Sequence, residues 1–302
     1  MNGNARLAAN SRTCAHPREA LEEARSQAPG QFVRLTEGLT HYRCDGPVDG
    51  TPIVLIHGAT VPCWEFDGIV PLLTMTGFRT LRFDLYGHGR SDRPHGAYSL
   101  DRFTRQTIEL VEALGVLRPV VMLGHSLGAA IAAAVTAANP QRIEQLVLVA
   151  PMLDFNSTSA WSQVFRVPLL GDLLMRFVGL PALIRRRRRR YARIGAPHLT
   201  PLFIEQVSHA GFGRALLSMI RTNTLGDQSA GYSALRNWGR ELLVITGAND
   251  AVIPAAHIAR IRALLAEHDH REIPGAEHNL LLTHPQAVVD ELRGKRLKAH
   301  QA

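Results

Sequence analysis

Residues 124–128 read G-x-S-x-G and could present a serine for nucleophilic chemistry. An apolar run, residues 120–123, precedes them, and an alanine-rich run, residues 127–138, follows them. This context of strand, turn and helix predicts a tight turn that exposes the hydroxyl of Ser126 at the edge of a sheet. Flanking glycines leave room for the neighbouring backbone. The pattern therefore predicts a serine nucleophile.

A serine hydroxyl is a poor nucleophile at neutral pH, so it needs a base and a group that orients the base. Open α/β sheets place their chemistry on loops at the carboxyl ends of strands. Asp250 follows a strand-like run at residues 241–246, and His278 follows another at residues 269–273. The order Ser126, Asp250, His278 is the one expected when the nucleophile lies on such a turn.

Other residues compete for the acid and base roles. Asp250 could instead cap the helix that follows Pro254, because aspartate is a favoured N-cap residue. Asp154 follows the preceding strand and is the alternative acid. His284 is the alternative base, although its position just before a proline is typical of a helix start.

The elements that must hold these residues alternate along the chain. Strand patterns are predicted at residues 31–35, 39–43, 52–57, 79–84, 120–123, 145–150, 241–246 and 269–273, and helical patterns at 65–76, 100–114, 127–138, 255–266 and 285–298. Apolar strands separated by helices indicate an α/β fold whose parallel sheet is covered on both faces. From about residue 152 to 235 the pattern is helical only, which predicts an inserted helical segment.

Five motifs occur in a fixed order: His57-Gly58, Gly87-His88-Gly89-Arg90-Ser91-Asp92, residues 124–128, Gly247-x-x-Asp250 and Gly275-x-x-His278. With them, residues 31–298 resemble the α/β-hydrolase superfamily, in its small serine esterase and lipase-like branch. The resemblance implies an eight-stranded, mostly parallel sheet with helices on both faces. It divides the chain into an N-terminal extension (1–30), a core (31–151 and 236–302) and a helical cap or lid (152–235).

The resemblance also implies roles for individual residues. Ser126 would attack an acyl carbonyl, His278 would take and return the proton, and Asp250 would orient the imidazole. The backbone N–H groups of Ala59 and Leu127 would form the oxyanion hole. Neither a metal ion nor a cofactor is expected.

Three further histidines lie close to these motifs in the sequence. His57 precedes the serine, so the resemblance assigns it a structural place beneath the oxyanion loop. His88 and His125 are also expected to be structural, because histidines near such sites commonly serve as hydrogen-bond partners.

The helical insertion is rich in Leu, Phe, Val and Met. Trp161, Phe165 and Leu170 are expected to line an acyl pocket, although apolar stripes on helices also pack cores. A lipophilic carboxylic ester is therefore the expected substrate. A C–C bond hydrolase or a cofactor-free perhydrolase with the same triad is the alternative, and a non-catalytic binding protein on this fold is another. Epoxide hydrolases and haloalkane dehalogenases carry aspartate where this chain has Ser126.

The net charge of +8 is concentrated in one segment. Residues 185–190 are six arginines and Arg193 is a seventh, so removing these seven leaves +1. Such a run is typical of a solvated helix face, and it could instead make a weak contact with an anionic membrane. Because the rest of the chain is nearly neutral, no nucleic-acid partner is expected.

The remaining composition fits a globular protein of 302 residues. Cys14, Cys44 and Cys63 match no metal-site spacing and are predicted to be unpaired thiols. Residues 1–30 lack the apolar centre of a secretory signal, and no apolar run approaches the roughly 18 residues of a membrane span. A cytoplasmic protein is therefore expected.

Overall fold

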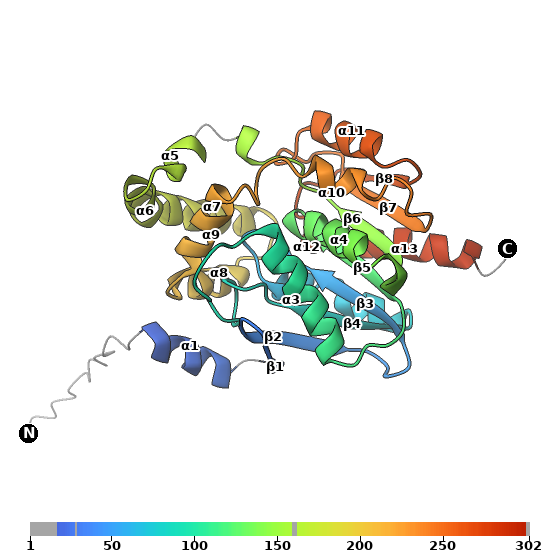
Figure 1. The fold of residues 1–302 in the computed structure, drawn as a ribbon, viewed down its shortest axis with the longest axis horizontal. Helices are drawn as coiled ribbons and strands as arrows, with labels where there is room; N and C mark the ends of the chain where they lie inside the picture. Colours follow the sequence, from blue (N-terminus) through green and yellow to red (C-terminus); the bar gives the residue numbers. More distant parts are fainter. Residues whose placement is uncertain (1–16, 28, 159–161, 300–302) are drawn as a thin grey trace, which may run out of the picture.

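The computed structural model describes residues 17–27, 29–158 and 162–299. Eight strands form one sheet in the order β1-β2-β4-β3-β5-β6-β7-β8 (Figure 1). The pairs β1–β2 and β2–β4 are antiparallel and the other pairs are parallel, which confirms the predicted sheet. The strands are β1 Gln31–Leu35, β2 Gly38–Asp45, β3 Thr51–Ile56, β4 Phe78–Phe83, β5 Val120–His125, β6 Ile143–Val149, β7 Glu241–Gly247 and β8 Asp269–Ile273.

Two apolar cores cover the two faces of this sheet. Because side chains alternate along a strand, Val54 and Ile56 of β3 join one core, whereas Ile53 and Leu55 join the other. The first core includes residues of α3 Leu100–Ala113, α4 Leu127–Ala138 and α11 Ala255–Leu264. The second includes residues of α2 Val70–Met75, α12 Leu280–Thr283 and α13 Pro285–Ala299. Helices on both faces explain why the parallel strands are apolar throughout.

The prediction of one helix over residues 65–76 is wrong, because the structure has two separate helical elements in this region. A 3-10 helix, η1, spans Cys63–Phe66, and α2 begins only at Val70. Pro71 lies in the first turn of α2, where its missing N–H has no helical partner to lose. The proline therefore fits a helix that starts at residue 70 but would interrupt one that started at residue 65.

The N-terminal extension contains a helix, α1 Pro17–Ser26, which contacts the loop after β4. Arg25 anchors it: Nε donates to the carbonyl of Arg90 at 2.9 Å, and Nη2 pairs with Asp92 at 2.5 Å. A buried arginine thus ties the described part of this extension to the loop after β4.

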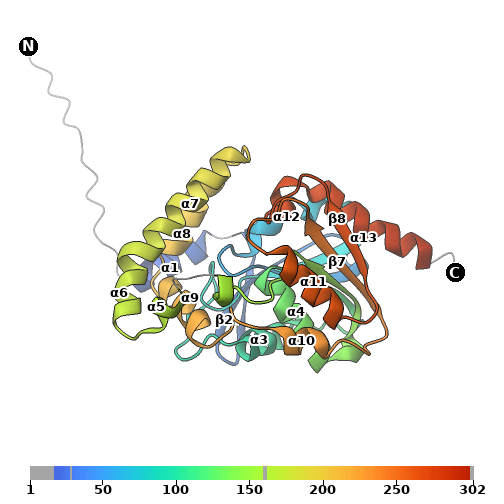
Figure 2. The same ribbon diagram turned by 90° about the horizontal axis from the view of Figure 1, so that it is seen from above.

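The residues between β6 and β7 form helices and turns, with no strand in the part that the structure describes. Helices α5 to α9 gather on one side of the molecule, apart from α11 to α13 (Figures 1 and 2). They are α5 Ser162–Arg166, α6 Leu170–Leu174, the π-helical turn η4 Met175–Gly179, α7 Leu180–Arg193, α8 Leu199–Ser208 and α9 Phe212–Arg221. The last helix of the insertion, α10 Ser229–Ser233, packs against α4 and α11 instead. Among the described residues, none of the helices has the length and apolarity needed to cross a membrane.

Candidate active site

Ser126 occupies the sharp turn between β5 and α4. Its φ of 55° and ψ of −114° lie in a region that non-glycine residues rarely adopt. Backbone hydrogen bonds hold it there: its N–H donates to Val149 at 2.9 Å, and its carbonyl accepts from Ala129 at 3.1 Å and Met152 at 3.2 Å. Such a conformation costs on the order of 1–3 kcal/mol, and the surrounding sheet and helix sustain it.

The glycines of the motif are required by close packing. A Cβ on Gly128 would lie 2.0 Å from the carbonyl oxygen of Ile56, and a Cβ on Gly124 would lie 2.1 Å from that of Gly128. Neither position has space for a side chain, because backbone atoms already fill it. The two glycines therefore let α4 start directly against β3 and β5.

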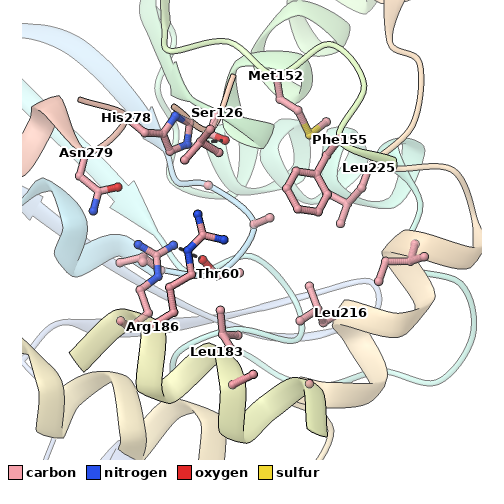
Figure 3. A pocket seen from close by; sticks show the side chains of 18 of the residues that line it. Thr60, Ser126, Met152, Phe155, Leu183, Arg186, Leu216, Leu225, His278 and Asn279 are labelled. Carbon is pink, nitrogen blue, oxygen red and sulfur yellow. Dashed lines mark hydrogen bonds between the residues drawn. The ribbon is translucent and has the colours of Figure 1, made fainter. Parts of the chain in front are cut away.

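The structure brings the three predicted triad residues together. Figure 3 shows two of them, Ser126 and His278, side by side. Nε2 of His278 lies 3.2 Å from Oγ of Ser126, and Nδ1 of His278 lies 2.9 Å from Oδ2 of Asp250. With Nδ1–H donating to the carboxylate, Nε2 presents a lone pair to the serine hydroxyl. Each residue follows the carboxyl end of a different strand: Ser126 follows β5, Asp250 follows β7 and His278 follows β8.

Asp250 is fixed by both carboxylate oxygens. Oδ1 accepts the N–H groups of Val252 at 2.7 Å and Ile253 at 3.0 Å, while Oδ2 accepts from His278. The N-cap of α11 is Pro254, so Asp250 does not cap that helix. Burial raises the pKa of Asp250, but the hydrogen bonds from His278 and the backbone outweigh burial, and the pKa is lowered overall.

The alternative acid and base have other partners. Asp154 accepts the N–H of Ser157 at 3.0 Å at the start of a short 3-10 helix, η3 Asn156–Thr158. His284 lies 2.9 Å from the hydroxyl of Thr283, just before α13. Neither contact joins the hydrogen-bonded chain that ends at Ser126.

His278 has the protonation that a general base needs. Burial lowers its pKa, and the hydrogen bond to Asp250 opposes this shift without cancelling it. A pKa below the usual 6.5 keeps the imidazole neutral at pH 7. His278 is therefore ready to accept the serine proton.

The backbone N–H groups of Ala59 and Leu127 stay candidates for an oxyanion hole. Ala59 follows β3 and lines the cavity beside Ser126, and Leu127 is the first residue of α4. Within the described residues, neither N–H has a protein acceptor. Two free donors next to a nucleophile could stabilise a developing negative charge.

Two buried histidines hold the loop that carries Ala59. Nε2 of His57 accepts the N–H of Leu85 at 2.9 Å, and its Nδ1 lies 2.7 Å from the carbonyl of Gly58. Nε2 of His88 lies 2.9 Å from the carbonyl of Ala59, and burial lowers the pKa of His88 to about 3. Both rings bond to the backbone of the loop, so their place is structural.

Glu65 is a buried residue of the site that sequence reasoning missed. Its carboxylate accepts the N–H of Gly58 at 2.9 Å and pairs with Nδ1 of His125 at 3.2 Å. Burial lowers the pKa of His125, but the carboxylate of Glu65 outweighs burial and raises it overall. Glu65 thus joins the loop of Ala59 to the turn of Ser126. Glu65 lies in the short 3-10 helix η1 and belongs to none of the five sequence motifs, so the sequence pattern did not single it out.

A cavity of about 410 Å³ opens beside Ser126 and His278 (Figure 3). One part is apolar and is lined by Met152, Phe155, Phe165, Leu183, Leu216 and Leu225. Phe165 thus lies where it was expected. Leu170 does not line this cavity, and its side chain is 48% exposed. Trp161 lies outside the described residues.

The arginine run divides between the cavity and solvent because it lies on one helix, α7. Arg186, Arg187 and Arg190 line the cavity. The others, Arg185, Arg188 and Arg189, are exposed. Arg186 lines the cavity and is exposed as well. The expectation of a solvated face therefore holds for four of the six arginines and fails only for the partly buried Arg187 and Arg190.

A cluster that could bind a metal by residue type is already occupied by hydrogen bonds. The ligand atoms of His41, Cys63 and Asp84 lie within 4.8 Å of one another. The carboxylate of Asp84 accepts from His41 at 2.8 Å and from the N–H groups of Cys63 and Arg90, both at 2.9 Å. These bonds explain the cluster as a structural junction. Cys63 and the exposed Cys44 are free thiols, and Cys14 lies outside the described residues.

Comparison with known proteins agrees with this fold. Residues 53–291 match the family model described as the alpha/beta hydrolase family. The chain is 28% identical to a non-heme chloroperoxidase of Streptomyces lividans, over 83% of this chain and 93% of that protein. It is also 28% identical to a haloalkane dehalogenase of Mycolicibacterium paratuberculosis, over 78% and 77% of the two chains. A thermophilic esterase from Thermogutta terrifontis has the same fold, with a TM-score of 0.73 at 20% identity, over 90% of this chain and all of that one. The chain therefore belongs to the alpha/beta hydrolase family.

Proposed function

We propose that the protein hydrolyses carboxylic esters with an apolar acyl group through an acyl-enzyme on Ser126. The observation that carries this proposal is the hydrogen-bonded chain from Asp250 through His278 to Ser126, which ends at an apolar cavity. A neutral histidine beside a serine hydroxyl supplies the base that this chemistry requires.

The proposed reaction has two halves. In the first, Oγ of Ser126 bonds to the ester carbonyl carbon while its proton moves to Nε2 of His278. The N–H groups of Ala59 and Leu127 bind the resulting oxyanion, and His278 then protonates the departing alcohol. In the second, water gives a proton to His278 and attacks the acyl carbonyl. The acid leaves, and Ser126 regains its proton.

The nucleophile argues for acyl transfer over dehalogenation. One relative is called a haloalkane dehalogenase. Enzymes of that kind carry aspartate at the turn between strand and helix where this chain has Ser126. An alkyl halide has no carbonyl for a serine to attack. The shared fold is therefore compatible with different chemistry at the nucleophile.

Perhydrolysis is the second candidate, and the similarity to a protein called a non-heme chloroperoxidase favours it. In this reaction hydrogen peroxide takes the place of water in the second half, so the acyl group leaves as a peracid. The same Ser126 and His278 would serve. Peracid formation with added peroxide, measured against acid release, separates the two outcomes.

Hydrolysis of p-nitrophenyl esters of increasing acyl length tests the main proposal. We expect turnover in the parent protein and a loss of roughly 10⁴-fold or more in Ser126→Ala, as is typical when the nucleophile of such a triad is removed. Activity that survives Ser126→Ala would refute the mechanism. The chain-length profile then measures how much acyl chain the cavity accepts.

A further inference from the structure

One wall of the cavity is cationic, although the rest of the lining is mainly apolar. Arg186, Arg187 and Arg190 reach it from three positions of α7. Figure 3 shows Arg186 extending from this helix toward the side of the cavity where Ser126 and His278 lie. Arg186 is exposed, whereas Arg187 and Arg190 are partly buried, and a partly buried guanidinium is costly to desolvate unless an anion pairs with it.

The protein supplies little negative charge to this wall. Arg190 pairs with Glu277 at 2.9 Å, but the same carboxylate also pairs with Arg193 at 2.7 Å. Among the described residues, Arg186 and Arg187 have no carboxylate within ion-pair distance. Glu65 also lines the cavity and acts on Arg187, but its carboxylate is already bound to Gly58 and His125. The two carboxylates, Glu65 and Glu277, therefore do not balance the three arginines of this wall.

Arg187 is held in place by neutral groups. Its Nη2 donates to the hydroxyl of Thr60 at 2.5 Å, and its guanidinium lies 5.7 Å from the ring centre of Phe203. Burial lowers the pKa of Arg187, but an arginine stays charged at neutral pH. Thr60 directly follows Ala59, so this charge lies close to the carbonyl-binding part of the site. A positioned but unpaired guanidinium is ready to bind an anion.

A second unpaired donor points to the same conclusion. Asn279, directly after His278, lines the cavity and is buried, yet its Nδ2 has no hydrogen-bond partner among the described residues. Buried amide N–H groups are rarely left without an acceptor, because the loss costs about 1–3 kcal/mol. An oxygen of a bound ligand would satisfy it.

From these contacts we infer that the natural substrate is an ester that carries a compact anionic group, a carboxylate or a phosphate, which Arg186, Arg187 and Asn279 bind. This inference rests on the proposed ester hydrolysis and narrows its substrate class. The apolar part of the cavity, around Leu216 and Leu225, would take the hydrocarbon portion of the same molecule. The substrate is thus amphipathic.

Matched esters test the charge preference. Mono-(4-nitrophenyl) adipate and 4-nitrophenyl hexanoate have six-carbon acyl chains that differ in one terminal carboxylate. A second pair, 4-carboxyphenyl hexanoate and phenyl hexanoate, places the carboxylate on the alcohol side, and 4-phosphonooxyphenyl hexanoate replaces it by phosphate. We expect kcat/KM to favour one of the anionic esters by roughly tenfold or more over its neutral partner, as one or two charge-assisted hydrogen bonds would give. Added salt should reduce that ratio.

The arginine variants then locate the preference. Arg186→Gln/Arg187→Gln should reduce the anionic-to-neutral ratio roughly tenfold, whereas Arg188→Gln, at a position that does not line the cavity, should leave it unchanged. Equal losses for both esters in the double variant would overturn the inference, because they would mean that the arginines act on the oxyanion or on folding alone. A parent enzyme without any anionic preference would overturn it too.

A binding experiment separates this inference from the proposed function. Calorimetry on Ser126→Ala compares monomethyl adipate with dimethyl adipate, and 4-carboxyphenyl and 4-phosphonooxyphenyl hexanoate with phenyl hexanoate. Selective binding of an anionic compound without hydrolysis of any ester by the parent would support the anion site and reject the esterase. Hydrolysis of neutral esters with equal binding within every pair would support the esterase and reject the anion site.

Discussion

The imidazole of His125 lies against that of His278, with ring centres 5.0 Å apart. Nε2 of His125 lies 3.0 Å from the carbonyl oxygen of His278, and its Nδ1 pairs with Glu65. The charge on His125 contributes to the lowered pKa of His278. The residue before the nucleophile therefore tunes the base.

Replacing His125 by asparagine should shift the pH profile. The acid limb of kcat/KM in the parent enzyme should lie below pH 6.5, because the neutral form of His278 is the active one and its pKa is lowered. Without a positive charge on His125 the pKa of His278 rises, so the acid limb should move to higher pH. His284→Asn, outside the triad, is the control. An unchanged profile in His125→Asn would show that the two rings are not coupled.

The backbone strain at Ser126 should be measurable as stability. Glycine adopts a positive φ without a Cβ penalty, so Ser126→Gly should be more stable than Ser126→Ala by about 1 kcal/mol. Urea unfolding of the two inactive variants measures this difference. Equal midpoints would mean that the turn relaxes when the hydroxyl is removed.

Gly128 should tolerate no side chain. A methyl group there meets the carbonyl oxygen of Ile56 at 2.0 Å, so Gly128→Ala should lower the free energy of unfolding by about 3 kcal/mol or prevent folding. Gly231→Ala in α10 is the matched control, because its methyl group would have no neighbour within 4 Å. The control should be neutral or slightly stabilising, since alanine favours helices. Similar losses in both variants would argue against the close packing of α4.

The apolar part of the cavity should set the acyl length. Leu216→Trp fills space in this part, so kcat/KM for long-chain p-nitrophenyl esters should fall roughly tenfold, while that for the acetate changes less. Leu173→Trp, on the exposed side of α6, should leave the profile unaltered. A uniform loss for all esters would indicate a general disturbance of the site.

The exposed arginines of α7 are the remaining candidates for a weak contact with anionic lipid. Arg185, Arg188 and Arg189 are exposed, and the preceding segment exposes Leu173 and Phe177. Each basic residue near a charged bilayer contributes about 1 kcal/mol. We expect co-sedimentation with phosphatidylcholine vesicles only when they contain phosphatidylserine, and less of it after these three arginines are changed to serine.

The control for that experiment removes the same charge elsewhere. Arg34, Arg236 and Arg262 are exposed on other elements, so changing them to serine matches the loss of three charges. If α7 makes the contact, only the variant of α7 should lose co-sedimentation with the vesicles. An equal loss of co-sedimentation in both variants would mean that net charge alone explains the binding. No binding by the parent protein would reject the contact.

The sequence by itself determined the fold class and predicted the three residues that the structure joins by hydrogen bonds. Apolar alternation and glycine turns are local signals that can be read from the sequence. Because the carboxyl ends of parallel strands meet at one edge of a sheet, these signals also place Ser126, Asp250 and His278 close together. Pro71 shows the limit of periodicity, because the apolar spacing around it continues through a turn that divides one predicted helix into two.

Only the tertiary structure decided which polar residues surround the nucleophile. Six identical arginines carry no pattern of their own, so the run alone could not show that Arg186, Arg187 and Arg190 are the ones that line the cavity. That choice depends on how α7 packs, with Glu277 pairing to Arg190 beside His278. Glu65 belongs to no motif. It contacts His125 because the segment after β3, which contains η1, lies next to the turn that carries Ser126. Contacts between distant elements depend on packing, which local sequence patterns do not encode.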